Sequence, residues 1–321
     1  FTERLFRLAL RTAYIYNQDG YGRGRGWRIA LAPAVGLFDA LLFRKVRAAF
    51  GGCLEFFVGG GALLDTELQR FFYAIGIPMF QGYGLSEATP VISTNSPKHH
   101  WHRFGSSGKI LIPLDLKIVD EQGHELPRGQ RGEIVVRGEN VMAGYWKNPE
   151  ATAEAFTPDG WFRTGDLGEF DKDGWLYIKG RLKNMIVGPG GENIYPEDIE
   201  SVLNSHVCIA DSIVTEHEGR LVALVHFNRE EIEAMLDDWR EEWATQKEAW
   251  EAKTEQLKKE IMDFVNAKVS RFSRISEVVE EKEEFVKTPT HKIKRFLYNK
   301  RGKASGGEEG PQGGPSGSGA R

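Results

Sequence analysis

The chain has 321 residues, and its 42 lysines and arginines are nearly balanced by 46 aspartates and glutamates, giving a net charge of -4 at neutral pH. Nucleic-acid binding requires a basic surface that neutralises phosphates, so this balance argues against nucleic acid as a partner. The two cysteines, Cys53 and Cys208, are far apart and indicate neither a disulfide framework nor a paired-thiol metal site, which fits a cytoplasmic protein. This length predicts about two domains with hydrophobic cores.

The first 50 residues carry apolar side chains at helical spacing, interrupted at 20–26 by a glycine and arginine stretch where we expect a loop. The longest apolar segment, 29–43, contains Pro33 and Asp39 and is shorter than the roughly 20 residues that span a bilayer. We therefore expect no transmembrane segment and predict a buried helix or loop there. Neither an initiator methionine nor a signal segment begins the chain at Phe1, so we expect it to be a piece of a longer protein.

An α/β unit followed by a strand-rich region is predicted next. A strand at 54–58 runs into the glycine turn 59–62, and helical spacing follows at 64–73. From 110 to 181 short apolar runs alternate with Gly, Asp and Pro turns, which predicts a mainly β subdomain. Its strands are expected at 116–119, 133–136 and 175–178.

A small α/β domain of about a hundred residues is predicted after residue 182. Its strands are expected at 185–187, 212–214 and 221–225, and a helix at 196–203. The charged helical stretch from 230 to 269 carries tryptophans at Trp239, Trp243 and Trp250. We interpret it as an amphipathic helix pair that covers its own domain, with a partner-facing or membrane-facing surface as the alternative. Residues 302–321 are mostly Gly, Ser, Pro and charge, which predicts a disordered tail.

Three short motifs suit a nucleotide. The glycine turn 59–62 would let the backbone approach a flat ligand, although a plain turn is the more ordinary explanation. Residues 82–87 (Gly-Tyr-Gly-Leu-Ser-Glu) combine an aromatic face, a hydroxyl and a carboxylate between glycines, as a nucleotide and its metal ion require. Asp166 is interpreted as a carboxylate on a turn, able to accept hydrogen bonds from both hydroxyls of a ribose, or else as part of an ordinary Gly-Asp turn.

Two polar segments flank the predicted small domain. Residues 180–184 (Gly-Arg-Leu-Lys-Asn) suit a hinge between domains, and the basic loop 287–295 is, by itself, a solvated patch. His99, His100 and His102 are clustered, but neighbouring histidines rarely share one coordination sphere and nothing completes a ligand set. We therefore predict no metal site at these histidines.

The order of the motifs is more specific than any one of them. Gly-Gly-Ala, Gly-Tyr-Gly-Leu-Ser-Glu, Thr-Gly-Asp, Gly-Arg-Leu-Lys-Asn, Gly-Glu-Asn-Ile-Tyr-Pro-Glu-Asp-Ile-Glu (191–200) and Thr-Pro-Thr-His-Lys-Ile-Lys-Arg follow one another along the chain. Together they resemble the adenylate-forming (AMP-binding) enzyme superfamily, and within it the C-terminal portion of bacterial long-chain fatty acyl-CoA synthetases. The resemblance covers about residues 48–300.

The resemblance implies an α/β adenylate-forming fold. Residues 1–109 would be an α/β layer of the large nucleotide-binding domain and 110–182 its β subdomain. Residues 183–301 would form a small mobile α/β C-terminal domain, followed by the tail 302–321.

The activity implied by the resemblance is that of a ligase that uses ATP, Mg²⁺ and coenzyme A. It would activate a fatty acid as an acyl-adenylate and transfer the acyl group to the thiol. An adenylating enzyme for another carboxylate or an acyl-carrier acceptor, and a catalytically dead acyl-adenylate or nucleotide binding module, are the alternatives. Because the implied substrate is a lipid, a peripheral position at the inner face of the membrane stays open, as does the oligomeric state.

Roles for individual residues also follow from the resemblance. Glu87 would hold Mg²⁺ and Lys292 would bridge the α-phosphate and the substrate carboxylate, as the catalytic residues. Lys183 would be the hinge, and the loop with Gly190 and Gly191 would form the access path of coenzyme A. The nucleotide-binding residues would be Gly61, Ala62, Tyr83, Gly84, Ser86, Asp166 and Arg181.

The chain departs from the family pattern at three points. The Ser/Thr/Gly-rich phosphate loop with its lysine, expected far upstream of the tyrosine motif, does not occur in the sequence. We therefore expect residues 1–321 alone to be inactive or nearly so. Val187 stands where some relatives have lysine, which puts one phosphate or thiol contact in doubt, and His291 replaces a common glycine beside Lys292.

Overall fold

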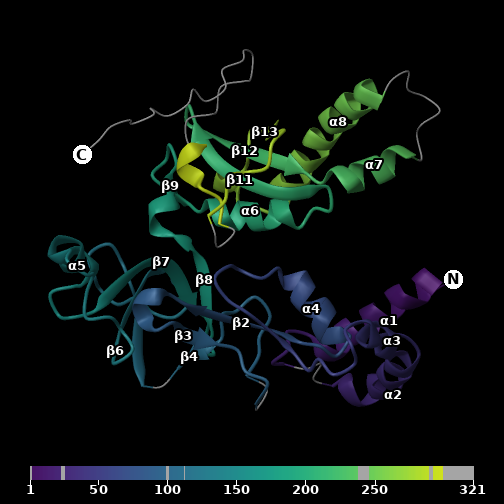
Figure 1. Cartoon of the computed structure of the whole chain (residues 1–321), viewed down its shortest axis with the longest axis horizontal. Helices are drawn as coiled ribbons and strands as arrows, with labels where there is room; N and C mark the ends of the chain where they lie inside the picture. The colour runs from purple at the N-terminus through teal and green to yellow at the C-terminus, as the bar shows by residue number, and fades with distance from the viewer. Residues whose placement is uncertain are drawn as a thin grey trace, which may run out of the picture.

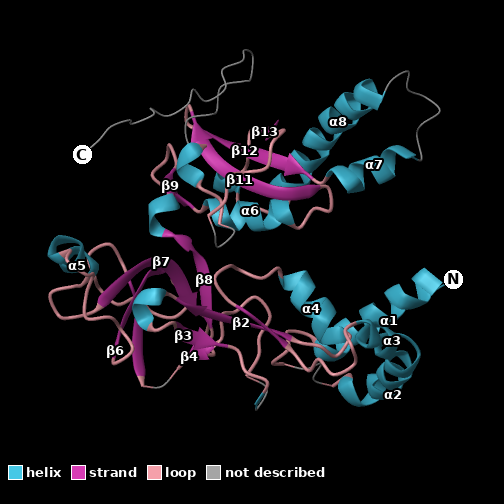
Figure 2. Cartoon of the chain, in the orientation of Figure 1, coloured by secondary structure: helices cyan, strands magenta, loops and turns pink. Residues whose placement is uncertain are grey.

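The computed structural model describes residues 2–22, 26–98, 101–111, 113–237, 246–288 and 292–298. Helices gather at the N-terminal end, a β-rich part lies in the middle, and the C-terminal part combines helices with a sheet (Figure 1). Figure 2 shows the same division by type of element. In these ranges no helix is long and apolar enough to cross a membrane. The predicted tail 302–321 lies outside the described residues.

Four helical segments form the N-terminal region: α1 (Thr2–Asn17), α2 (Arg28–Phe38), the π-helix η1 (Asp39–Phe43) and α3 (Arg44–Ala49). Small alanines on α1, Ala9 and Ala13, allow close packing against Phe43, and all three side chains are fully or almost fully buried. Ile75 and Ile77, which follow helix α4 (Thr66–Ala74), complete this cluster. The N-terminal helices therefore share a core with the α/β unit that follows them.

The expectation of a buried segment at 29–43 was half wrong. The segment is helical, as α2 and η1, but no side chain of α2 is buried and Ile29 is 91% exposed. The physical reason is that α2 packs against α1 and η1, and these contacts leave every side chain of α2 at least partly exposed. Hydrophobicity alone predicted the helix and could not predict which face would be covered.

The first sheet has the order β1-β2-β3-β4. Its strands are β1 (Phe57–Gly59), β2 (Met79–Gly84), β3 (Val91–Thr94) and β4 (Lys109–Ile110). β1 pairs parallel to β2, with α4 as the crossover between them, and the remaining pairs are antiparallel. The predicted strand and helix are confirmed, although the strand begins at Phe57 rather than Leu54 because only residues 57–59 pair with β2.

The second sheet is antiparallel, in the order β5-β6-β7-β8. Its strands are β5 (Leu114–Val119), β6 (Gly132–Gly138), β7 (Phe162–Phe170) and β8 (Leu176–Arg181), with helix α5 (Pro149–Ala155) before β7. The three strands predicted in this region are confirmed. The turn predicted around Asp166 is wrong, because this residue lies inside β7. Gly165, with φ +68°, and the register shift opposite on β6 give the strand a local irregularity there.

One hydrophobic cluster joins the two sheets. Tyr83 and Ile92 of the first sheet pack with Ile134, Val136 and Leu176 of the second. The predicted boundary at 109/110 falls within β4, the last strand of the first sheet, and the two sheets share this core.

The C-terminal part contains two further sheets. A small ladder joins β9 (Ile186–Val187) to β10 (Asn193–Ile194). The larger sheet has the order β11-β12-β13, built from β11 (Ile209–His217), β12 (Arg220–Phe227) and β13 (Glu277–Glu280). Three helices accompany it: α6 (Pro196–Asn204), α7 (Arg229–Asp237) and α8 (Gln246–Asn266). β12 and β13 are parallel, so α7 and α8 form the crossover between them.

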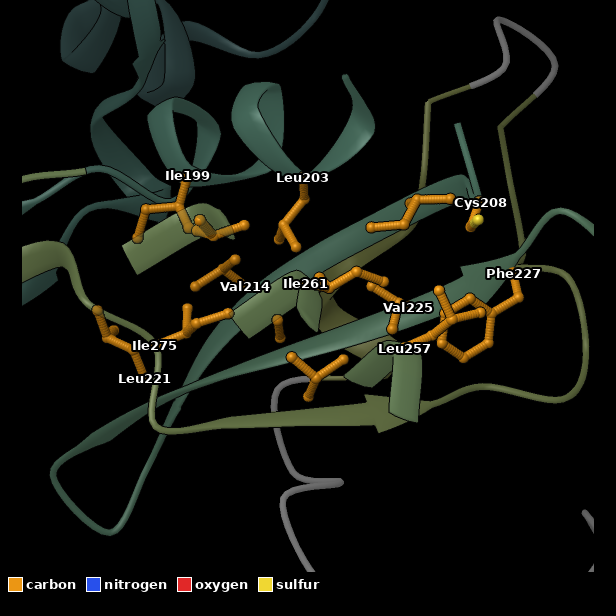
Figure 3. Close-up of a cluster of buried hydrophobic side chains, with 14 of the residues drawn as sticks. Ile199, Leu203, Cys208, Val214, Leu221, Val225, Phe227, Leu257, Ile261 and Ile275 are labelled. Atoms are coloured by element: carbon orange, nitrogen blue, oxygen red, sulfur yellow. The ribbon is translucent and has the colours of Figure 1, made fainter. Parts of the chain in front are cut away.

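Alternating side chains of β12 supply two cores, one on each face of this sheet. Ala223 and Val225 face α6 and α8, where Leu257 and Ile261 of α8 are almost fully buried (Figure 3). Val222 and Leu224 point to the opposite face, toward Phe285 and Tyr298. The prediction that the charged helical stretch covers its own domain is confirmed for α8, whereas Trp239 and Trp243 lie outside the described residues.

Candidate active site

Tyr83, Asp166 and Arg181 come together where the two larger sheets meet. Asp166 on β7 is directly opposite Arg181 at the end of β8, and the Arg181 Nε lies 2.8 Å from Asp166 Oδ1. The Tyr83 hydroxyl, at the end of β2, donates to Asp166 Oδ2 over 2.8 Å. Both carboxylate oxygens of Asp166 are thus engaged, one by a cation and one by a hydroxyl donor.

Burial controls the electrostatics of this group. Asp166 is 7% exposed, and the loss of hydration raises the pKa of its carboxyl, while Arg181 and the Tyr83 hydroxyl act in the opposite direction. Burial first, and the Asp166 charge second, raise the pKa of Tyr83 well above its usual range. The hydroxyl of Tyr83 therefore stays protonated and remains a donor to the carboxylate.

Gly84 and Gly61 have different backbone settings. A Cβ at Gly84 would lie 1.7 Å from the carbonyl oxygen of Pro90, so only glycine fits there. Gly61 has φ +82° and open space where its side chain would be, and Ala62 beside it is exposed. The Leu64 amide donates to the buried side chain of Gln81, which ties the glycine turn to β2.

Ser86 and Glu87 follow Tyr83 in the chain by three and four residues and lie in the short 3₁₀ helix η2 (Ser86–Ala88). Ser86 is exposed, and Glu87 Oε1 accepts a 3.1 Å hydrogen bond from the Tyr145 hydroxyl. The described residues contain no group of three or more His, Cys, Asp or Glu side chains able to hold a metal ion, and Glu87 offers one carboxylate. Such a donor fits Mg²⁺ that takes its other ligands from substrate phosphates and water.

Lys292 comes from the C-terminal part of the chain. Its side chain is exposed, and its charge lowers the pKa of Asp166, which puts it within electrostatic reach of the Tyr83–Asp166–Arg181 group. Two hydrogen bonds with Thr288 fix the backbone of Lys292. The Thr288 amide donates to the Lys292 carbonyl over 2.7 Å, and the Lys292 amide donates to the Thr288 hydroxyl. His291 lies outside the described residues.

Lys183, Gly190 and Gly191 lie farther along the chain, in the segment that leads into the C-terminal part. Lys183 is exposed in the 3₁₀ helix η4 (Leu182–Asn184), directly after Arg181. Gly190 and Gly191 form the exposed turn between β9 and β10, where Gly191 has φ +83°. No hydrogen bond or ion pair among the described residues joins these three to Asp166.

Two residues near the site escaped the sequence analysis. Thr164 is buried, donates its hydroxyl to the Ile134 carbonyl over 2.8 Å and accepts the Asp166 amide, so it fixes the backbone of the aspartate. It lies in the Thr-Gly-Asp motif and could have been found there. Tyr145 is 58 residues from its partner Glu87, and no local pattern indicates that contact.

His102 is the member of the histidine group that the structure describes. His102 is buried and stacks on Tyr73 with ring centres 5.0 Å apart, with Phe80 and Phe104 at its edges. Tyr73, Phe80 and His102 also line a cavity of about 210 Å³. His99 and His100 lie outside the described residues.

Part of the chain is similar to known proteins. Residues 26–146 match the family model described as AMP-binding enzyme. The chain is 39% identical to the long-chain-fatty-acid–CoA ligase FadD15 of Mycobacterium bovis over 211 residues, which are 66% of this chain and 33% of that protein. It is 45% identical to the 2-succinylbenzoate–CoA ligase of Geobacillus kaustophilus over 160 residues, 50% of this chain and 32% of the relative.

Solved structures show the same fold. The ATP-bound RpMatB-BxBclM chimera B1 superimposes with a TM-score of 0.65 at 28% identity, over 83% of this chain and 51% of that one. The O-succinylbenzoate CoA synthetase of Bacillus subtilis with its acyl-adenylate intermediate gives a TM-score of 0.62 at 28% identity, over 79% and 47% of the two chains. The architecture is thus the α/β adenylate-forming fold. The chain spans about a third of the length of the curated relatives it matches.

Proposed function

We infer that this chain, whose family match and structural neighbours support membership of the AMP-binding enzyme superfamily, is part of an AMP-forming acid–CoA ligase. The observation that carries this proposal is the Tyr83–Asp166–Arg181 group with Lys292 in electrostatic reach. A carboxylate held between a cation and a tyrosine hydroxyl suits the ribose of an adenylate, and the tyrosine ring suits its base. The positive charge of Lys292 suits the phosphate of the same adenylate.

In the proposed reaction, a carboxylate oxygen of the substrate attacks the α-phosphorus of ATP, and the bond to pyrophosphate breaks. The thiolate of coenzyme A then attacks the acyl carbon and AMP leaves, while the thiol proton goes to solvent. The first step brings two anions together, so its barrier is largely electrostatic. A cation placed at the developing charge lowers that barrier.

The chain's own residues would supply binding and charge. Tyr83 stacks on the adenine beside Gly61 and Ala62, with Gly84 allowing the close backbone approach, while Asp166 accepts hydrogen bonds from the ribose hydroxyls. Arg181 keeps Asp166 ionised and lies beside the nucleotide, and Ser86 donates to a phosphate oxygen.

Glu87 would hold Mg²⁺ together with phosphate oxygens, because the described residues contain no group of three or more His, Cys, Asp or Glu side chains that could hold the ion. When bound, the ion neutralises phosphate charge. Lys292 would bridge the α-phosphate and the substrate carboxylate, a role supported by its electrostatic effect on Asp166. It sits on the C-terminal part, so its charge is removable between the two steps if that part rotates at Lys183 and the Gly190–Gly191 turn moves in to admit coenzyme A.

The domain proposal follows from the cores. Residues 1–109 and 110–182 share a cluster across their two sheets, and the clusters of the C-terminal part contain only residues from Ile186 onward. This supports a large domain ending at 182 and a mobile small domain at 183–301.

A long-chain fatty acid is the proposed substrate, supported by the similarity to the fatty-acid ligase of Mycobacterium bovis. The relatives also include ligases named for 2-succinylbenzoate, indoleacetate and ferulate, so an aryl acid is the second candidate. A cytoplasmic location remains part of the proposal for either substrate.

The test is binding of stable adenylate analogues, with a sulfamate in place of the phosphate, to the 321-residue chain. A long-chain acyl analogue is compared with an aryl analogue and with AMP by calorimetry. Two buried methylenes at about 0.8 kcal/mol each correspond to roughly tenfold in affinity, so the long-chain analogue should bind at least that much more tightly than AMP. Tighter binding of the aryl analogue would indicate an aryl acid as the substrate. Absence of AMP binding would contradict the nucleotide site itself.

A catalytically dead binding module predicts the same adenylate binding. Turnover separates the two: acyl-CoA formation is expected when the upstream phosphate-loop half of a relative is supplied, whereas the dead module gives none. Residues 1–321 alone are expected to form acyl-CoA slowly or not at all, since the sequence holds no phosphate loop.

A further inference from the structure

The contact between the C-terminal part and the rest of the chain is polar. Every hydrophobic cluster of the described residues lies wholly on one side of the segment 182–185. No shared apolar core therefore fixes the angle between the two parts. Polar and cation–π contacts join the two parts among the described residues.

Arg131 makes two of these contacts with the start of helix α6. It lies just before β6 and its side chain is 21% exposed. Its Nη1 donates to Asp198 Oδ2 over 2.9 Å, and its guanidinium carbon lies 4.1 Å from the centre of the Tyr195 ring. Tyr195 is the N-cap residue of α6 and Asp198 is in its first turn, so Arg131 holds this end of the helix by charge and by ring stacking.

Helix α6 in turn contacts the segment that carries Lys292. Glu200 of α6 forms an ion pair with Arg295, and Arg295 Nη2 lies 4.0 Å from Glu197 Oε1. Arg295 is three residues after Lys292 in the same short segment. Two carboxylates of α6 thus contact an arginine that lies three residues from the lysine.

The same helix touches β8 beside Asp166 and Arg181. A Cβ at Gly180 would lie 2.6 Å from Glu197 Oε2, and Glu197 Oε1 accepts a 2.6 Å hydrogen bond from Asn184. With a side chain at residue 180, the Glu197 carboxylate would have to move from its present position against β8. A rotation of α6 away from Arg131 would break this contact as well.

We propose that Arg131 is a positioning residue: by holding the first turn of α6, it keeps Arg295 and Lys292 in the orientation that brings the lysine to Asp166. The importance of Arg131 for catalysis rests on the proposed function, since Lys292 is the residue proposed to act at the phosphate. The contact and its effect on orientation need no ligand.

The experiment measures the distance between the two parts in the ligand-free 321-residue chain. Spin labels are attached at Glu121→Cys and Arg274→Cys, two exposed positions, with Cys53→Ser to remove the exposed native thiol. The distance distribution is recorded for Arg131→Gln by double electron–electron resonance. Loss of a partly exposed ion pair and a cation–π contact should raise the population of other orientations about threefold to tenfold.

Three further variants make the result specific. Arg131→Lys keeps a cation beside Asp198 and Tyr195, so it should retain most of the original distribution. Asp198→Asn removes the charge from the other side and should broaden the distribution as Arg131→Gln does. Arg137→Gln breaks an ion pair with Asp115 on the same sheet, away from α6, and should change nothing.

An unchanged distribution in both Arg131→Gln and Asp198→Asn overturns the proposal, as does equal broadening in Arg137→Gln. Circular dichroism on each variant checks that both parts remain folded. Because no nucleotide is present, failure of this test is separate from failure of the nucleotide site, which the adenylate titration examines.

Discussion

The hydroxyl of Tyr83 donates to the carboxylate of Asp166, 83 residues later in the chain, over 2.8 Å. This bond links the end of β2 in the first sheet to β7 in the second. Arg181 meets the other carboxylate oxygen at 2.8 Å, so the aspartate is oriented from two sheets at once. The proposed nucleotide site therefore lies at the junction of the two sheets.

Replacing Tyr83 with Phe should destabilise the fold while leaving the aromatic face in place. A buried carboxylate oxygen loses its donor, which costs about 1–3 kcal/mol. Urea unfolding measures this change. The control Tyr145→Phe removes a hydroxyl bond to Glu87 in a more exposed setting and should cost less, about 0.5–1 kcal/mol. Equal losses in the two variants would argue against a special role for the buried bond.

AMP binding should weaken in acid at a higher pH than an ordinary aspartate would cause. Burial raises the pKa of Asp166, so protonation begins above the usual range of aspartate, near 3.9. Once protonated, Asp166 has one acceptor fewer for the ribose hydroxyls, and its carboxyl no longer carries the negative charge that pairs with Arg181. The affinity for AMP therefore falls as the pH falls through the raised pKa. Titrations of AMP across the acid range, at pH values where the chain stays folded, measure this midpoint. A midpoint at or below that of free aspartate would contradict the assignment.

Gly84→Ala should strongly destabilise the chain. The new Cβ would lie 1.7 Å from the Pro90 carbonyl, so β2 or the following turn must move, at a cost we expect to exceed 2 kcal/mol, roughly that of severe overpacking. Gly36→Ala on α2 is the matched control. Nothing lies within 4 Å of its Cβ position, and alanine in a helix should stabilise by about 0.5–1 kcal/mol. Denaturation midpoints of the two variants should therefore move in opposite directions.

Ile261→Ala should weaken the C-terminal part and spare the larger one. Ile261 is fully buried between α8 and the sheet, so the cavity should cost about 2–5 kcal/mol. Hydrogen exchange should then accelerate in β11 and β12 while β6 and β7 keep their protection. Equal acceleration in all four strands would show that the two parts unfold as one unit.

The sequence predicted those elements whose apolar runs are bounded by turn residues, such as the strands at 116–119 and 133–136. It missed β7 because Gly165, Gly168 and several charged residues interrupt any alternation, and the strand exists through its neighbours on both sides. It predicted a buried α2 from hydrophobicity and could not foresee the exposed face.

Residues of the candidate site could be predicted from the sequence only where they lie in a motif. Tyr83, Asp166 and Arg181 each lie in a recognisable segment, and their meeting needed the register of β7 with β8. The contacts of Glu87 with Tyr145 and of Arg131 with Asp198 span 58 and 67 residues, and no local pattern encodes them. Such contacts are properties of tertiary structure.

Calorimetric titration of AMP into the 321-residue chain tests whether the group around Asp166 binds an adenylate. We expect binding at one site, weakened at least about tenfold by Asp166→Ala, since hydrogen bonds to a charged group contribute about 1.5–3 kcal/mol. The control Asp115→Ala, which replaces an exposed aspartate on β5 of the same sheet, should bind as the original chain does. Equal affinity in the Asp166 and Asp115 variants, or no binding by the unaltered folded chain, would rule out an adenylate site at Asp166.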